Sequence, residues 1–172
     1  NMDIISHGLW SGFAFGRKNK KLYWWAIGFG LMPDLFSFGI LSAAKVLGLT
    51  SGPDWEQGLP DPMEIPQIIH TLYNITHSLI VFALVFGLVW FWLRKPFFPM
   101  LGWGLHLLMD IPTHSAAFFP TPFLWPLSDF TVNGIGWGQP IIFYPNIALL
   151  VIGYLGWWIY KKNKNRYGTA RK

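Results

Sequence analysis

The sequence predicts an all-α fold, an integral membrane helical bundle of about five transmembrane segments. The first observation is composition: 52% of the 172 residues are hydrophobic and only 12% are charged, whereas soluble domains carry about 25% charged residues. The second is the 19% share of aromatic residues, together with a positive mean hydropathy. The third is a series of apolar stretches close to the ~20 residues that a ~30 Å hydrocarbon core requires.

The apolar stretches differ in length and quality. The first is short and contains glycine, so we expect a full or partial span packed against the others. The last is the cleanest candidate, because its apolar run has full spanning length. The five predicted segments are residues 4–15, 22–41, 76–93, 97–109 and 141–160.

The basic residues predict the orientation of these segments. They gather at residues 17–21, 94–95 and 161–172, with Lys45 as the exception. Cytoplasmic loops collect Lys and Arg, so five spans place all three clusters in the cytoplasm and the N-terminus outside. If the first segment does not cross, only the N-terminus changes side. We expect a multi-pass protein of the cell (inner) membrane, with a single embedded domain over residues 1–160 and a basic cytoplasmic tail, residues 161–172, after it.

Composition also limits the function. The chain has no cysteine, which excludes disulfides, Cys-ligated zinc and iron–sulfur clusters, so any metal is bound by histidine and carboxylate. The N-terminus lacks the basic region of a cleaved signal peptide. The net charge is +5, and the basic residues that produce it lie beside the predicted spans. This placement indicates a role in membrane orientation and in contact with anionic lipid. We therefore expect membrane lipid as the partner and no nucleic acid, while the sequence leaves the oligomeric state open.

Ionisable residues within the predicted spans are the strongest functional signal, because each costs about 2.5–3.5 kcal/mol at a helix centre. His106 and Asp110 stand four residues apart, so they share one helix face and can reach one ion or two adjacent ions. His70 and His77 stand seven apart on a helix that Pro66 is placed to start. The remaining members of the set are His7, Asp34 and His114.

The depth of these residues is similar in all four segments. At 1.5 Å per residue, His7, Asp34 and His77 lie about 15 to 25 Å from the nearest basic cluster. The pair His106 and Asp110 lies at a matching depth of about 16 to 22 Å. A shared site would therefore open toward the extracytoplasmic side.

The types of residue in the set indicate a metal. Histidine nitrogens with carboxylate oxygens suit Zn²⁺ first, with Mn²⁺ and Fe²⁺ as alternatives. The candidate ligands outnumber the four that one zinc takes, so we expect two ions that share a carboxylate, as in sites that act at phosphorus.

Each residue also has a structural alternative. His7 or His114 alone is explained by a helix cap or the membrane interface, and Asp34 by a cap that follows Pro33. His70 is explained by the interface or by support of a ligand. A structural ion pair is the weakest explanation for His106 and Asp110, which lie inside an apolar helix.

Several motifs, taken in order, resemble the YdjM-like family of bacterial and archaeal membrane-bound, metal-dependent hydrolases, often described as LexA-regulated. They are Asn74-Ile-Thr76-His77-Ser78-Leu79, His106-Leu-Leu-Met-Asp110-Ile and Phe123-Leu-Trp125-Pro126-Leu-Ser128, with His7-Gly8 and Pro33-Asp34 in matching positions. The resemblance covers roughly residues 3–160. That family is similar in turn to zinc-dependent phospholipase C, so the resemblance implies an all-helical fold with a phospholipase-C-like metal-binding core.

The resemblance also implies roles for single residues. It implies five metal ligands, with the carboxylate of the fifth bridging two ions: His7, Asp34, His77, His106 and Asp110. Asp34 is alternatively a general base, and His70 or His114 protonates the leaving group or contacts phosphate. The sequence departs from the family at His114, where a small or polar residue is common, and after Asp34, where a second acid is absent.

The predicted function is hydrolysis of a phosphoester in a phospholipid or lipid-linked phosphate at the extracytoplasmic leaflet. Water activated by the metal would attack phosphorus. One alternative is a metal transporter or a metal-binding protein without a reaction, although the inner halves of the spans show almost no polar path. Another is a di-iron lipid oxidase, although such enzymes carry closely spaced histidine pairs that this chain lacks.

Overall fold

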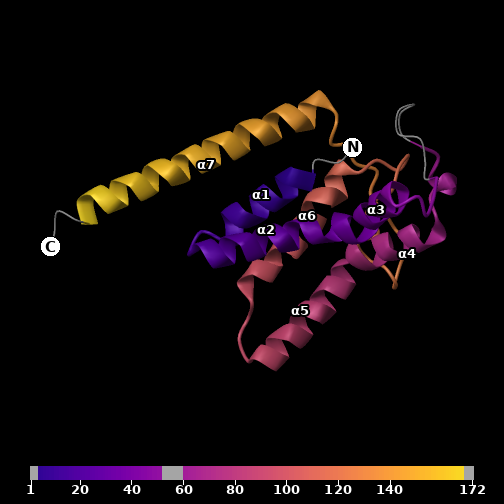
Figure 1. Ribbon diagram of the computed structural model, residues 1–172, viewed down its shortest axis with the longest axis horizontal. Helices are drawn as coiled ribbons and strands as arrows, with labels where there is room; N and C mark the ends of the chain where they lie inside the picture. Colours follow the sequence, from indigo (N-terminus) through magenta and orange to yellow (C-terminus); the bar gives the residue numbers. More distant parts are fainter. Residues whose placement is uncertain (1–3, 52–59, 169–172) are drawn as a thin grey trace.

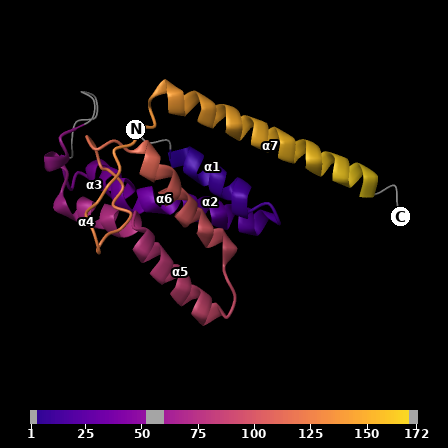
Figure 2. The same ribbon diagram turned by 180° about the vertical axis from the view of Figure 1, so that it is seen from behind.

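The computed structural model describes residues 4–51 and 60–168, with side chains described up to residue 164. All regular elements in these ranges are helices, which confirms the predicted all-α class. Figures 1 and 2 show most helices gathered in one body, with α7 extending along its edge.

The first two helices, α1 (Ile4–Phe15) and α2 (Lys20–Asp34), form a tight hairpin. Asn19 begins α2, because its side-chain oxygen accepts a hydrogen bond from a first-turn N–H at 2.9 Å. Glycine lets the two backbones approach closely, since a Cβ at Gly30 would lie 2.7 Å from the His7 carbonyl oxygen. The hairpin therefore fixes α1 against α2 at the level of His7.

The helix does not stop after Asp34 but changes its winding. It continues as the single π-turn η1 (Leu35–Gly39) and then as α3 (Ile40–Val46). Pro33 lies just before the transition, and proline in a helix interior removes a backbone hydrogen bond. Such π-turns are rare and often mark functional positions, and this one directly follows Asp34.

A bend of 58° separates α4 (Gln67–Thr76) from α5 (Leu79–Leu93). Pro66 immediately precedes α4, as predicted. Ser78 begins α5, because its hydroxyl oxygen accepts hydrogen bonds from two first-turn N–H groups at 3.1 Å. The third predicted span therefore starts after the bend, which leaves His77 between the two helices.

The next helix, α6 (Leu101–Thr113), follows the short 3-10 helix η3 (Phe98–Met100) and packs against α1 and α2. A Cβ at Gly102 would lie 2.7 Å from the Ala26 carbonyl oxygen, so glycine again permits the close contact. This packing brings one face of α6 directly onto the α1–α2 hairpin.

The chain over residues 114–139 forms no helix and returns over the end of α6. The Gly134 N–H donates to the His114 carbonyl at 2.8 Å, and the Ile135 N–H donates to the Pro112 carbonyl at 2.9 Å. These bonds hold the returning segment against the end of α6.

The last helix, α7 (Pro140–Gly168), lies along one edge and packs mainly on α1 (Figure 1). Asn146 accepts a hydrogen bond from the Trp10 indole N–H at 2.8 Å and donates to Ser6 Oγ at 2.7 Å. The Tyr154 hydroxyl donates to a backbone carbonyl of α1 at 2.8 Å. Most other side chains of α7 are apolar and exposed, as expected of a helix that faces lipid.

Two helical segments among the described residues are long and apolar enough to cross a membrane, Lys20–Val46 and Pro140–Lys164. The bent pair α4 and α5 makes a third if it crosses as one unit. The helices α1 and α6 have 12 and 13 residues, so each is about 20 Å long or less and shorter than a ~30 Å core. The structure thus supports two to three full-length spans, and the two short helices fall below the length that five spans require.

The segments that carry the predicted basic clusters, up to residue 168, lie toward one end of the molecule (Figures 1 and 2). They occupy the α1–α2 turn, the connection from α5 to η3, and the C-terminal part of α7. The polar residues singled out in the spans lie toward the opposite ends of the same helices.

Candidate metal centre

Four histidines and two aspartates form one buried cluster, here called the His/Asp cluster. Four of its side chains have no exposed surface, and the other two are at most 5% exposed. Its members are His7 from α1, Asp34 from the end of α2, His77 from the α4–α5 bend, His106 and Asp110 from α6, and His114 directly after α6. The structure therefore brings all five predicted ligands together, while metal binding by them stays a prediction.

Backbone carbonyls orient three of the histidines. The Nδ1 atoms lie 2.7 Å from the Gly30 carbonyl for His106, 3.1 Å from the Tyr73 carbonyl for His77, and 2.8 Å from the Phe119 carbonyl for His114. A carbonyl only accepts hydrogen bonds, so in each ring Nδ1 carries the hydrogen. The Nε2 lone pair of each neutral ring is then free to bind a metal, as in metal sites whose histidines donate their other N–H to the protein.

The Nε2 atoms lie close to one another and to the carboxylates. His106 Nε2 is 3.0 Å from Asp110 Oδ2 and 3.3 Å from His77 Nε2. His7 Nε2 is 3.1 Å from Asp110 Oδ1, and His77 Nε2 is 3.5 Å from Asp34 Oδ1. Two atoms bound about 2.1 Å from one ion at a tetrahedral angle lie about 3.4 Å apart. The observed separations therefore match those between ligands of a shared ion.

Several buried atoms of the His/Asp cluster have no hydrogen-bond partner. They are both ring nitrogens of His7, both oxygens of Asp34, Oδ2 of Asp110 and Nε2 of His114. Leaving a buried polar atom unpaired costs about 1–3 kcal/mol, so a convergent group of them is unusual in a folded protein. Nitrogen and oxygen donors in this arrangement fit a Zn²⁺-type ion, which would satisfy them.

The charge of the cluster favours a cation. With neutral histidines, Asp34 and Asp110 bring two negative charges into an almost fully buried cluster. A buried charge is costly unless it is paired, and a divalent ion compensates both carboxylates at once.

The end of α2 is tied to the α4–α5 bend beside Asp34. The Thr76 hydroxyl lies 3.2 Å from the Pro33 carbonyl, and the Trp103 indole N–H donates to the Thr76 carbonyl at 2.7 Å. These contacts join α2, α4 and α6 next to His77. Residues that are distant in the sequence are thereby held within ligand distance.

Two aromatic residues that the sequence analysis did not identify pack against the cluster. The Trp137 indole Nε1 lies 3.4 Å from Asp110 Oδ1, and its ring meets the His7 ring edge-on at 5.2 Å. Tyr73 stacks on His77 with ring centroids 3.8 Å apart, and its hydroxyl donates to the Phe119 carbonyl at 2.8 Å. Neither position stands out among the 11 Trp and 6 Tyr of the chain, so no sequence signal distinguished them.

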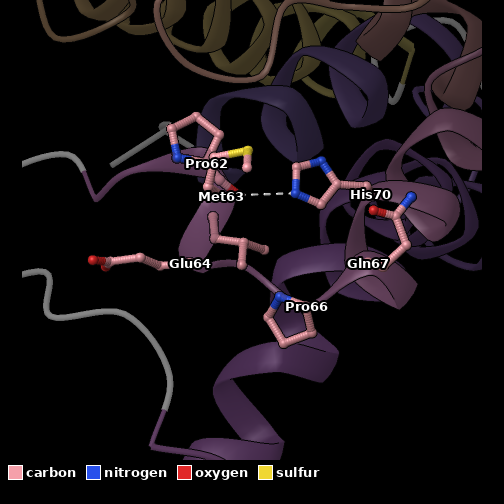
Figure 3. Close-up of a pocket in the computed structure, with 7 residues that line it drawn as sticks. Pro62, Met63, Glu64, Pro66, Gln67 and His70 are labelled. Atoms are coloured by element: carbon pink, nitrogen blue, oxygen red, sulfur yellow. Dashed lines mark hydrogen bonds between the residues drawn. The ribbon is translucent and has the colours of Figure 1, made fainter.

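His70 does not join the His/Asp cluster. Its Nε2 lies 3.0 Å from the Pro62 carbonyl, and its ring stacks on Phe119. Figure 3 shows it at the wall of a shallow pocket of about 400 Å³, opposite Pro62 and Met63. Seven residues of helix separate His70 from His77 by about 10 Å, which explains why both cannot reach one site. Its catalytic role stays a prediction without support from position.

The fold and the cluster define a helical membrane protein with a buried histidine–aspartate site that can hold metal. The chain belongs to the family described as YdjM inner membrane protein, whose model matches residues 2–170. This confirms the family that the motifs resemble and its membrane location. No curated protein and no solved structure matches the chain, and the similarity to phospholipase C stays a prediction.

Proposed function

We propose that the chain is a membrane-embedded, metal-dependent hydrolase that cleaves a phosphoester of a phospholipid or lipid-linked phosphate at the extracytoplasmic leaflet. The observation that carries the proposal is the His/Asp cluster, in which buried nitrogen and oxygen atoms lie close together and six of them have no hydrogen-bond partner. Well-packed apolar residues usually stabilise a core as well as buried charged groups do. A cluster of this cost, assembled from separate helices, therefore favours a functional centre.

Zn²⁺ is the proposed ion, and Mn²⁺ and Fe²⁺ are the alternatives that accept the same donors. The residues that would hold it are His7, Asp34, His77, His106 and Asp110. Such an ion, when bound, activates water as a nucleophile and compensates charge on phosphate oxygens. Asp34 is alternatively the general base rather than a ligand, since both of its oxygens lack a hydrogen-bond partner.

Two features support a lipid substrate. Asp34 is followed by Leu35 and Phe36, whose side chains are 49% and 54% exposed, so apolar surface adjoins the cluster. The cluster members also lie away from the helix ends that carry the basic clusters, since Asp34 ends α2 and His77 precedes α5. Because basic loops stay in the cytoplasm, this orientation would place the centre near the outer headgroups.

The test is phospholipid turnover by the purified full-length protein in mixed micelles, followed by mass spectrometry, with metal content measured by elemental analysis. We expect turnover that depends on the metal, and a loss of both metal and turnover by at least tenfold in His106→Ala. His70→Ala is the matched control for metal content alone, because His70 lies outside the cluster. If His106→Ala keeps its metal content and its lipid turnover, the proposal is wrong.

Burial of the ligands also favours a second candidate, a metal-binding protein without a reaction. Structural zinc sites are closed, whereas catalytic sites keep an open position, and four of the six side chains here have no exposed surface. This candidate predicts a full metal content with no turnover of any lipid headgroup. Metal-dependent turnover by the wild type would exclude it.

A further inference from the structure

The two oxygens of Asp110 face two different pairs of histidines. Oδ2 lies 3.0 Å from His106 Nε2 and 3.5 Å from His77 Nε2. Oδ1 lies 3.1 Å from His7 Nε2 and 3.5 Å from His114 Nε2. The carboxylate therefore divides the His/Asp cluster into two sides, each with two nitrogens and one oxygen.

The number of free lone pairs supports this division. His106, His77 and His114 each use Nδ1 as a donor to a carbonyl, so each offers one nitrogen to one ion. Four imidazoles and two carboxylates exceed the four ligands of a tetrahedral zinc site. A carboxylate, in contrast, has lone pairs on both oxygens and can bridge two ions.

His114 has the geometry of a ligand on the Oδ1 side. It is 5% exposed, and its Nε2 has no hydrogen-bond partner. A separation of 3.5 Å from Asp110 Oδ1 exceeds the usual 2.7–3.2 Å of an N–H···O hydrogen bond. It agrees with the spacing of about 3.4 Å between two ligands of one tetrahedral ion.

We propose that His114 is a direct metal ligand: together with His7 it would bind the second of the two expected ions, on the Oδ1 side of the Asp110 carboxylate. Asp34 belongs to the first ion, because its Oδ1 lies 3.5 Å from His77 Nε2 and 3.9 Å from His106 Nε2. His7 lies closest to the dividing line between the two sides of the cluster, because its ligand atom is also within 4.8 Å of the ligand atoms of Asp34 and His106. This inference rests on the metal binding in the proposed function and does not require hydrolysis.

The first test is the zinc content of the purified full-length protein after chelation, reloading and removal of free metal. We expect two ions per chain in the wild type, about one in His114→Ala and two in His70→Ala. His70→Ala is the control. Like His114, His70 contacts a backbone carbonyl, and its ring stacks on an aromatic side chain, but it lies outside the cluster.

The second test looks for a new signal rather than a loss of metal. Because the chain has no cysteine, a single introduced thiol can be assigned without ambiguity. His114→Cys, loaded with Co²⁺, should show the near-ultraviolet charge-transfer absorption of a thiolate bound to cobalt. His70→Cys should not show it. Each variant is compared with the wild type loaded in the same way, and the thermal midpoint of the metal-free protein reports whether it is folded.

The outcomes separate this inference from the proposed function. No metal in the wild type overturns both. One ion in the wild type, or two ions in His114→Ala with no cobalt–thiolate band in His114→Cys, overturns the inference and leaves metal binding by the cluster intact. Two ions in the wild type, one in His114→Ala and a band in His114→Cys together support it.

Discussion

Single atoms of the backbone determine the chemistry of the His/Asp cluster. The carbonyls of Gly30, Tyr73 and Phe119 accept from the histidine Nδ1 atoms and thereby turn the Nε2 lone pairs inward. His7 is different, because neither of its ring nitrogens has a hydrogen-bond partner. It is held instead by rings, stacked on His106 at 3.9 Å and edge-on to Trp137, so its alignment depends on close packing around it.

Gly30→Ala tests this dependence. An added Cβ would lie 2.7 Å from the His7 carbonyl and against Ser11, so α1 would be displaced together with His7. We expect a loss of about 1–3 kcal/mol in stability from overpacking and weaker metal binding. Thermal unfolding in detergent and metal titration measure the two effects. The matched control is Gly28→Ala, because nothing lies within 4 Å of a Cβ there; equal behaviour of the two variants would contradict the prediction.

Trp137→Phe tests the indole that contacts Asp110 and His7 of the cluster. The substitution keeps an aromatic edge beside His7 and removes the N–H that lies 3.4 Å from Asp110 Oδ1. Outer contacts of metal ligands typically change affinity by about 10–100-fold, and this bond is long, so we expect a decrease near tenfold. Competition with a chelating dye measures it. Trp158→Phe, on the exposed surface of α7, should leave the affinity unchanged, and the prediction is wrong if both variants bind alike.

Helix ends supply half of the cluster, and helix faces supply the other half. Asp34 lies at the transition from α2 to the π-turn, and His77 lies in the bend between α4 and α5. His114 follows the last residue of α6. Backbone groups at helix ends lack partners within the helix, and their caps and connections therefore decide where these side chains point.

Ser78→Ala tests the bend beside His77. It removes the cap of α5 and the hydroxyl that donates to the Trp125 carbonyl. Loss of a serine cap costs about 1 kcal/mol, so we expect at least this decrease in the free energy of unfolding, measured by titration with dodecyl sulfate. Ser42→Ala is the control, since that exposed hydroxyl only contacts the Phe38 carbonyl of its own turn. A decrease no larger than that of the control would refute the role of the cap.

At the scale of the whole molecule, the helix ends that carry basic residues lie apart from the His/Asp cluster. The α1–α2 turn, the connection from α5 to η3 and the C-terminal end of α7 lie toward one end of the molecule (Figure 2), whereas the His/Asp cluster is built from the other parts of α1, α2 and α6 and from the α4–α5 bend. Positive charge is retained in the cytoplasm, so the separation predicts which side each end faces.

Cysteine labelling tests this orientation, because the natural chain has no cysteine. A maleimide that cannot cross the membrane should label Ala117→Cys in intact spheroplasts. It should label Lys18→Cys and Lys164→Cys only after permeabilisation. All three positions are exposed, so their side chains are equally accessible to the reagent. Labelling of Lys18→Cys and Lys164→Cys, but not Ala117→Cys, in intact spheroplasts would contradict the orientation.

The sequence predicted the membership of the cluster better than its surroundings. His106 and Asp110 share a helix face because of local periodicity, and local periodicity is visible in a sequence. The length of each span was less predictable, since α1 and α6 are apolar yet only 12 and 13 residues long. Apolar surface that packs on α2 and apolar surface that faces lipid have the same composition.

The contacts made by distant segments were not predictable. Trp137 reaches Asp110 only because the segment after α6 folds back by hydrogen bonds at Gly134 and Ile135. The division of Asp110 between two pairs of histidines depends on the relative placement of α1, α6 and the α4–α5 bend. Such relations arise from tertiary packing and leave no periodic signal.

The attachment of α7 has a mechanical consequence. Asn146 of α7 donates to Ser6 at 2.7 Å, and Ser6 is the neighbour of His7 on α1. A long apolar helix adjusts its tilt to the thickness of the bilayer, so a change in the tilt of α7 would act through Ser6 on the neighbouring residue, His7 of the His/Asp cluster. We therefore expect the spacing around His7 to change with the thickness of the surrounding membrane.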